Sequence, residues 1–299
     1  MKISIIGSGI VGQATGIGFT TNGNRVKFYD IDKGKLLALK SKGYDTTDNL
    51  VDAVNFSDIL FVCVPTPTVG RKIDYRYIYD CTKTIANALE EAQKYTVVTY
   101  RSTIPPQTTR TNLIPLLETY SNLKAGADFG VCMNPEFLRE KSAQEDFLNP
   151  NRIVVGALDE RSGVPLRKIY SSFKCPIIFT DLDTAEMIKY ASNTFLAAKI
   201  SFFNEIYLIC QKLNINPKIV ATAAALDPRI GSYGVDGGKP FGGMCLPKDL
   251  YAFIYFTKSM GLNPAMLQAI AKVNEEIGLY CSTKQEPQIE VRLPQTCSS

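Results

Sequence analysis

The sequence predicts an α/β protein in which a doubly wound parallel sheet is followed by a second, mostly α-helical domain. Up to about residue 182, short β-branched runs alternate with helix-like stretches, which is the pattern of βαβ units. A glycine-rich turn follows the first run, and beyond residue 183 the strand-like runs stop. The length of 299 residues suits two domains of about 100–200 residues each.

Seven short apolar runs have the composition of buried strands. Near-continuous runs of this kind indicate strands that are covered on both faces, as in a parallel sheet. Helix-like stretches at 10–22, 33–42 and 75–94 lie between several of them. We therefore expect one sheet domain over residues 1–182. The predicted strands are 2–6, 26–29, 59–64, 96–100, 129–132, 153–155 and 176–179.

The second predicted domain, residues 183–279, is built around one long helix. Asp183 and Glu186 resemble a capping box, and the chain from there to Leu213 contains no Gly or Pro. A helix of about 30 residues would be about 45 Å long. The residues after Tyr280 include two prolines and a serine-rich end, so we expect a poorly ordered tail at 280–299. Further helices are predicted at 217–226, 247–260 and 264–279.

Composition excludes several classes of function. The net charge of +4 is small and dispersed, which argues against a nucleic-acid partner. The chain has no histidine, so Ser-His and Cys-His nucleophiles and histidine-containing zinc sites are excluded, and no metal site is predicted. No run of 18 apolar residues is present, so no membrane span is expected. The eight cysteines form no CxxC pair and no signal peptide is apparent, which predicts reduced thiols and a cytoplasmic protein.

The glycine-rich turn reads GSGIVG at residues 7–12 and matches a dinucleotide-binding fingerprint. Gly7 would allow a tight turn, Gly9 would let the backbone approach a pyrophosphate, and Gly12 would permit close packing of helix on strand. The next predicted strand ends in Asp30, 18 residues after Gly12. A carboxylate there would accept hydrogen bonds from the adenosine ribose and repel a 2′-phosphate, so the pattern predicts a Rossmann-like domain that binds NAD. FAD is the alternative cofactor, and Lys35 is either a cofactor ligand or a solvated helix lysine.

A second candidate site lies in the glycine-rich loop that ends in PFGGMCLPKD at residues 240–249. Cys245 stands at a loop-to-helix transition near Lys248, where a thiol is expected to ionise more readily. A buried structural cysteine is the alternative interpretation. The adjacent glycines favour a place where backbone comes close to a ligand.

Other polar side chains are expected on the long helix and at strand ends. Lys189 and Asn193 are four residues apart, so they share a helix face and point either into solvent or into a cleft. Glu136 and Glu140 follow one predicted strand, and Ser102 and Thr103 follow another. The carboxyl ends of parallel strands are where doubly wound sheets bind ligands. Ordinary turn and cap roles remain the alternative for these strand-end residues.

Together these segments resemble the nucleotide-sugar dehydrogenase family from Met1 to about Gly278. The likeness is strongest to the UDP-glucose type, although GDP-mannose and UDP-N-acetylhexosamine types share the FGG-x-C-x-PKD element. Members carry a further α/β domain after the helical one, and we expect this chain to lack it. The motifs, in the order of the family, are GSGIVG (7–12), VPTP (64–67), RSTIPP (101–106), NPEFLRE (134–140), KYASN (189–193), DPRIG (227–231) and FGGMCLPKD (241–249).

The resemblance implies an NAD-dependent enzyme that oxidises C6 of a nucleotide sugar from alcohol to acid, with two NAD⁺ and one water. By similarity, Cys245 is the nucleophile that forms a thiohemiacetal and then a thioester. Lys189 would stabilise the developing oxyanion, and Asn193 would hydrogen-bond the C6 oxygen.

The remaining roles are also assigned by this resemblance. Asp249 and Thr103 would position water or transfer protons, and Glu136 would help to hydrolyse the thioester. The implied cofactor-binding residues are Gly7, Gly9, Ile10, Val11, Gly12, Asp30, Lys35, Thr66, Thr103, Glu140 and Lys248. The implied substrate-binding residues are Glu136, Phe137, Leu138, Lys189, Asn193, Arg229, Phe241 and Gly242.

A homodimer through the helical domain is implied as well, with Arg229 reaching the partner's site. The apolar residues Phe195, Phe202, Phe203 and Tyr207 on the long helix are expected to be exposed for this purpose.

Two other functions remain open. A β-hydroxyacid dehydrogenase would share the first domain and the Lys–Asn helix pair, but it does not need the loop of Cys245. A non-catalytic NAD-binding remnant would need almost none of the predicted catalytic residues.

Overall fold

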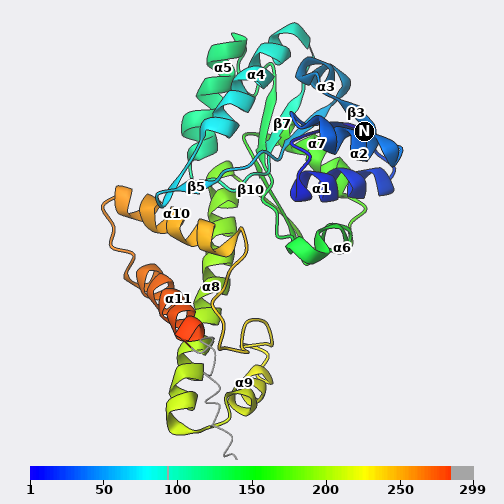
Figure 1. The fold of residues 1–299 in the computed structure, drawn as a ribbon. Coiled ribbons are helices and arrows are strands. Elements are labelled where there is room, and N and C mark those ends of the chain that lie inside the picture. The colour runs from blue at the N-terminus through cyan, green and yellow to red at the C-terminus, as the bar shows by residue number, and fades with distance from the viewer. Residues whose placement is uncertain (93, 284–299) are drawn as a thin grey trace, which may run out of the picture. The chain divides into compact units, whose positions relative to one another are not determined.

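The computed structural model describes residues 1–92 and 94–283, and its main feature is an eight-stranded sheet (Figure 1). The strand order is β10-β9-β8-β7-β4-β1-β2-β3. All seven predicted strands are confirmed, whereas β3 was not predicted because its sequence, Asp-Thr-Thr, has no apolar residue. The bounds are β1 Lys2–Ile6, β2 Arg25–Tyr29, β3 Asp45–Thr47, β4 Ile59–Val62, β7 Val97–Tyr100, β8 Gly130–Met133, β9 Ile153–Ala157 and β10 Ile177–Thr180.

The predicted doubly wound sheet is mainly parallel and contains one antiparallel pairing. Strands β8 and β9 pair antiparallel, with Met133 opposite Gly156, while every other pairing in the sheet is parallel. The segment between these strands, residues 134–152, starts at the carboxyl end of β8 and returns to β9 at the same end of the sheet. It therefore needs no helix that crosses the sheet. The NPEFLRE segment therefore stays at the edge where the other parallel strands end.

Helices cover both faces of this sheet, and two apolar clusters fill the spaces beneath them. Along β4, Leu60 and Val62 belong to one cluster and Ile59 and Phe61 to the other, as the alternation of side chains along a strand requires. One face is covered by α3 (Leu50–Phe56), α4 (Arg76–Ala92) and α5 (Ile114–Ser121); the other by α1 (Ile10–Thr21), α2 (Lys33–Ser41), α6 (Ala143–Leu148) and α7 (Glu160–Tyr170).

The helices α3, α5, α6 and α7 were not predicted; α3, α5 and α6 have eight residues or fewer and give little periodic signal, and α7 contains Pro165. Local caps and tertiary packing set them instead. Asn49, for example, accepts a hydrogen bond from the Val51 N–H at 2.9 Å and so caps α3. A hairpin of β5 (Thr68–Val69) and β6 (Lys72–Ile73) follows the VPTP segment.

The helical part of the chain consists of α8 (Leu182–Leu213), α9 (Pro217–Ala225), α10 (Leu246–Ser259) and α11 (Ala265–Thr283). Internal contacts divide the chain into one unit of Met1–Ser192 with Tyr251–Met260 and a second of Asn193–Leu250 with the chain from Gly261 onward. The division therefore falls within α8, which itself begins at the expected domain limit. Because α11 continues to Thr283, residues 280–283 are helical rather than a tail, and the rest of the predicted tail lies outside the described residues.

The start of α8 differs from the predicted capping box. Asp181, not Asp183, caps the helix by accepting a hydrogen bond from the Thr184 N–H at 2.8 Å. Asp183 instead pairs with Arg110 at 3.0 Å. Glu186 is fully buried and accepts hydrogen bonds from the Thr109 N–H at 2.9 Å and the Thr109 hydroxyl at 2.6 Å. Glu186 therefore holds the start of the helical segment after β7.

Glu186 should make the stability of the protein depend on pH. Burial raises the pKa of Glu186 from its ordinary 4.5 to about 7, so the folded state binds the proton more tightly than the unfolded state. This contribution is fully present below about pH 4.5 and is lost as pH rises through 7. We expect Glu186→Gln, which keeps the acceptor for Thr109, to be more stable than the parent at pH 8 by about 1–3 kcal/mol.

Urea unfolding of the parent and Glu186→Gln between pH 4.5 and 8 measures this difference. Glu118→Gln, a change at a carboxylate that forms an ion pair with Lys124, is the control. It should leave unchanged the slope of the unfolding free energy against pH between pH 4.5 and 7. An unchanged slope in Glu186→Gln would rule out this role of Glu186.

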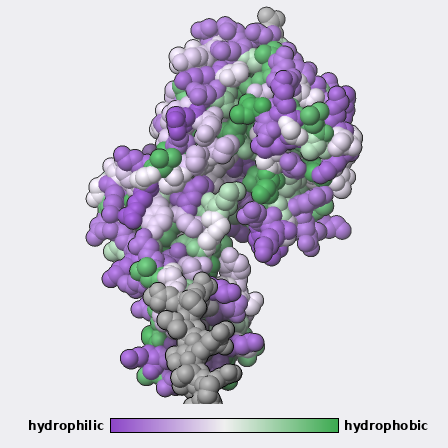
Figure 2. Space-filling model, in the orientation of Figure 1, coloured by the Kyte–Doolittle hydropathy of each residue, from purple (hydrophilic) through white to green (hydrophobic). Residues whose placement is uncertain are grey.

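The surface of the molecule carries apolar side chains in separate places. The face drawn in Figure 2 is mostly hydrophilic, with small apolar patches between hydrophilic residues. On α8, Phe195 and Phe202 are exposed as predicted, but Phe203 is buried and belongs to the core of the second unit with Ala221 and Val235. Within residues 1–92 and 94–283, no helix has the length and apolar character needed to cross a membrane.

Candidate active site

The glycine turn between β1 and α1 has the geometry that its sequence predicts. Gly7 has φ +97°, and a Cβ on Gly12 would lie only 1.9 Å from the Gly7 carbonyl oxygen, so both positions require glycine. A Cβ on Gly9 would meet no described atom within 4 Å. The space beside Gly9 is therefore open at the point where α1 begins at Ile10, with Val11 in its first turn. Open space beside the N–H groups of a helix start fits a pyrophosphate.

Asp30 lies at the carboxyl end of β2 and supports this turn. Its carboxylate accepts hydrogen bonds from the Ser8 N–H at 2.7 Å and the Asp32 N–H at 2.9 Å, and it is almost completely buried. The Lys35 ammonium lies 3.4 Å from the same carboxylate. Lys35 is thus positioned by Asp30, and Asp30 links the glycine turn to the start of α2.

Asp30→Ala should narrow the preference of the protein for NAD over NADP. The change removes the charge that repels a 2′-phosphate, and it also removes the acceptor for the Ser8 N–H, so we expect NADH affinity to fall about tenfold while NADPH affinity falls less. Fluorescence titrations with both reduced cofactors measure this change. Asp45→Asn, on the neighbouring strand, is the control. Tighter binding of NADPH than NADH by the parent protein would contradict the assignment.

Two loops meet at the carboxyl ends of β4 and β7. Thr66 donates a hydrogen bond to the Thr103 carbonyl at 2.8 Å, and Ser102 donates to the Val64 carbonyl at 2.6 Å. Thr66 is buried and Thr103 is partly exposed. The structure therefore brings together two of the predicted cofactor-binding residues, and Ser102 serves to join their loops.

Sequence reasoning missed a buried arginine and asparagine at the same edge. Arg101, next to Ser102, is buried; its guanidinium hydrogen-bonds the carbonyl oxygen of Asn134 at 3.3 Å and the Asn134 side-chain oxygen. Asn134 in turn donates to the Val154 carbonyl at 2.6 Å and accepts from Tyr170 at 2.6 Å. A charged residue directly after a buried strand was the available signal. This network fixes the start of the NPEFLRE segment.

Glu136 and Lys189 form a buried ion pair. The Lys189 ammonium lies 2.8 Å from Glu136 Oε1 and 2.6 Å from the Glu136 carbonyl oxygen, although the residues are 53 positions apart. The other carboxylate oxygen of Glu136 accepts a hydrogen bond from the Leu138 N–H at 2.6 Å. Burial alone would raise the pKa of Glu136, but the charge and hydrogen bonds of Lys189 and the Leu138 N–H outweigh it, and the pKa lies below its ordinary value. Glu136 is therefore a carboxylate at neutral pH.

The neighbours of this pair differ in exposure. Phe137 is half-buried, with the Arg152 guanidinium 3.9 Å and the Lys189 ammonium 5.6 Å from its ring centre. Glu140 opens a single turn of 3₁₀ helix, Glu140–Ser142, and is exposed. The ring of Phe137 thus contacts two cationic side chains, whereas Glu140 is exposed.

The predicted residues of the second unit also come together. Asp249 is fully buried; it accepts a hydrogen bond from the Asn193 amide at 2.6 Å and pairs with the Lys248 ammonium at 2.6 Å. Its own N–H donates to the Cys245 carbonyl at 2.9 Å. Cys245 is exposed and directly precedes α10. An exposed cysteine and a carboxylate–ammonium pair therefore share the start of α10, and the Asn193 amide of α8 hydrogen-bonds this carboxylate.

The glycine-rich loop before Cys245 presents its other predicted residues differently. Phe241 is buried, while Gly242 is exposed and a Cβ there would meet no described atom within 4 Å. Arg229 is almost fully exposed and pairs with Asp227 at 2.6 Å. Arg229 is thus displayed on the surface of this unit, away from its core.

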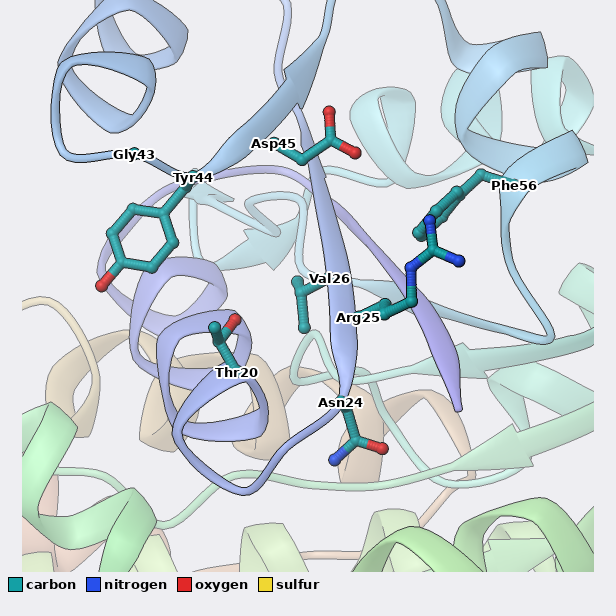
Figure 3. A pocket seen from close by; sticks show the side chains of 8 residues that line it. All are labelled: Thr20, Asn24, Arg25, Val26, Gly43, Tyr44, Asp45 and Phe56. Atoms are coloured by element: carbon teal, nitrogen blue, oxygen red, sulfur yellow. The ribbon is translucent and has the colours of Figure 1, made fainter.

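A hollow of about 250 Å³ lies elsewhere in the first unit (Figure 3). Its lining comes from the start of β2, from β3 and from the ends of α1 and α3, at the sheet edge opposite the glycine turn. None of the predicted site residues contributes to it. Its lining residues are Thr20, Asn24, Arg25, Val26, Gly43, Tyr44, Asp45 and Phe56.

Comparison with known proteins gives a consistent result for both parts of the chain. Residues 37–174 match the NAD binding domain of the UDP-glucose/GDP-mannose dehydrogenase family, and residues 183–276 match the central domain of that family. UDP-glucose 6-dehydrogenase TuaD of Bacillus subtilis is 34% identical over 92% of this chain and 63% of its own length. GDP-mannose 6-dehydrogenase of Pseudomonas putida is 34% identical over 92% of this chain and 68% of its own length.

A solved structure agrees with these matches. The UDP-glucose dehydrogenase of the hyperthermophilic archaeon Pyrobaculum islandicum is similar with a TM-score of 0.86 and 35% identity, over 92% of this chain and 68% of that protein. The chain therefore spans about two thirds of the length of the relatives that it matches.

Proposed function

Because the chain belongs to the UDP-glucose/GDP-mannose dehydrogenase family, whose members use NAD, we propose that it oxidises UDP-glucose to UDP-glucuronate. The reaction takes C6 from alcohol to carboxylate, with two NAD⁺ and one water. The observation that carries this proposal is the Asn193–Asp249–Lys248 cluster at the helix start that bears Cys245. NAD binding alone needs neither Asn193 nor Asp249.

The first unit supports the cofactor part of the proposal. The open backbone at Gly9 and the N–H groups at the start of α1 would hold the pyrophosphate, and Asp30 would face the ribose. Thr66, Thr103, Glu140 and Lys248 are the further cofactor residues that we propose. The chemistry that bound NAD⁺ supplies is acceptance of a hydride from C6.

The residues of the chain would then act on the C6 atom. The Cys245 thiolate adds to the C6 aldehyde to form a thiohemiacetal, and loss of a second hydride leaves a thioester. Asn193 donates its amide N–H to the C6 oxygen, with its orientation fixed by Asp249, and Lys189 stabilises the oxyanion. Glu136, held as a carboxylate, takes a proton from the water that hydrolyses the thioester, and Thr103 positions that water.

The identity of the substrate is tested by measuring the NADH formed for each molecule of nucleotide sugar consumed. We expect two NADH for each UDP-glucose consumed, and less turnover with GDP-mannose or a UDP-N-acetylhexosamine. Two NADH from GDP-mannose alone would favour that substrate, which the similar Pseudomonas putida enzyme also suggests. NAD binding without NADH from any nucleotide sugar would favour a non-catalytic remnant.

We also propose a homodimer through the helical unit. Phe195, Phe202, Ile209 and Leu213 are exposed on α8 at spacings of seven, seven and four residues, which places them on one side of the helix. Such a stripe is typical of a surface that packs on another subunit. Arg229, exposed on this unit, would reach the partner's site.

Sedimentation at micromolar concentration should show a dimer, and Phe202→Glu should shift it to monomer. Ile178→Glu, at an exposed apolar residue of β10, is the control and should leave the dimer in place. A parent protein that sediments only as monomer would refute the assignment.

We also propose a cytoplasmic location, since none of the cysteines within residues 1–92 and 94–283 forms a disulfide.

A further inference from the structure

Two asparagines hold the backbone of the loop that leads to Cys245. On α11, the side chain of Asn274 accepts from the Phe241 N–H at 2.7 Å and donates to the Phe241 carbonyl at 3.2 Å. On α8, Asn204 pairs in the same way with the N–H and carbonyl of Lys239, at 3.3 and 2.9 Å. Each asparagine therefore satisfies both backbone polar groups of one loop residue.

These two hydrogen bonds of Asn274, the clamp on Phe241, are followed along the loop by two glycines, Gly242 and Gly243. Neither Gly242 nor Gly243 has a described atom within 4 Å of the place where a Cβ would be, and Gly243 has φ +77°. The Cys245 carbonyl accepts a hydrogen bond from the Asp249 N–H, which gives the loop a second fixed point. Only three residues separate these two fixed points, so the position of Phe241 limits the paths that this backbone can take.

We propose that Asn274 is a positioning residue that sets the path of the loop from Phe241 to Cys245 and so places the reactive thiol. The proposal rests on the function given above for Cys245. Asparagine suits this task because one short side chain offers an acceptor and a donor to the same residue. Alanine offers neither, and aspartate keeps only the acceptor and puts a negative charge beside the Phe241 carbonyl.

Three variants of the full chain test the role of Asn274. Asn274→Ala removes both hydrogen bonds, and Asn274→Asp removes the donor. Ser201→Ala is the matched control, because the buried hydrogen bond that it removes joins α8 to the Ile270 carbonyl, one turn before Asn274 on α11, and not to the loop. Each variant is measured for kcat and for the KM of NAD⁺ and UDP-glucose, for amide exchange in residues 239–245, and for iodoacetamide labelling of Cys245 by mass spectrometry.

For Asn274→Ala we expect kcat to fall about 10- to 100-fold with an unchanged KM for NAD⁺, since a small displacement of a reacting group costs that much in rate. Amide exchange at 239–245 should be about tenfold faster, and the labelling rate of Cys245 should change severalfold. Asn274→Asp should lie between Asn274→Ala and the parent, and Ser201→Ala should match the parent in all three measurements.

The exchange and labelling measurements need no turnover, so they separate this proposal from the proposed function. Altered exchange and labelling in Asn274→Ala, together with a parent that oxidises no sugar nucleotide, would support the clamp and refute the proposed activity. Unchanged exchange and labelling would overturn the clamp, whatever the activity. Equal effects of Ser201→Ala would also overturn it, because they would reflect a general loosening of α11 on α8.

Discussion

Cys245→Ala should abolish formation of the acid product, with kcat for the four-electron oxidation reduced roughly 10⁴- to 10⁶-fold. Without the thiol no thiohemiacetal can form, so at most the alcohol and the aldehyde interconvert. Because Cys245 is exposed directly before α10, the fold should be retained. Stopped-flow absorbance and product analysis with UDP-glucose measure the loss.

Cys245→Ser gives the complementary result. An oxygen nucleophile can add to the aldehyde to form a hemiacetal, and loss of the second hydride then leaves an ester. This ester hydrolyses slowly, so a covalent adduct should accumulate and be seen by mass spectrometry. Cys175→Ser, at a partly exposed cysteine of the sheet domain, is the control and should turn over normally. Formation of two NADH by Cys245→Ala would refute the thioester mechanism.

Lys189→Met should reduce both stability and rate, and the two losses can be separated. Removing one partner of a buried ion pair leaves the other charge uncompensated, which costs about 3–5 kcal/mol of unfolding free energy. Losing a donor to the oxyanion costs about 10²- to 10³-fold in kcat. The pKa of Glu136 should rise as well, because the charge that opposes its burial is gone.

The double variant Lys189→Met with Glu136→Gln distinguishes these effects. It should regain most of the lost stability, since no buried charge remains unpaired, but none of the lost rate. Glu136→Gln alone should give a burst of NADH followed by a slow phase, because hydrolysis of the thioester is slowed more than hydride transfer. Recovery of activity in the double variant would contradict a direct role for Lys189.

The sequence by itself determined the elements that depend on local pattern. The runs at 2–6 and 59–64 became β1 and β4 because continuous apolar residues can be buried only between two covered faces. The GSGIVG turn follows from its glycines, since a side chain on Gly7 or Gly12 would meet backbone atoms. The glycine-rich sequence before Cys245 also indicated correctly that Cys245 and Lys248 stand at a loop-to-helix transition.

Only the tertiary structure decided which polar groups meet across the chain. Glu136 pairs with Lys189 because an antiparallel return from β8 to β9 keeps its segment at the edge that α8 reaches. The Asn274 side chain can hydrogen-bond the Phe241 backbone because α11 lies beside the loop that leads to Cys245. Local periodicity carries no information on such pairs, since the energy of a buried charge or an unsatisfied N–H depends on residues tens of positions away. For the same reason the burial of Glu186 against Thr109, 77 positions away, could not be derived from sequence.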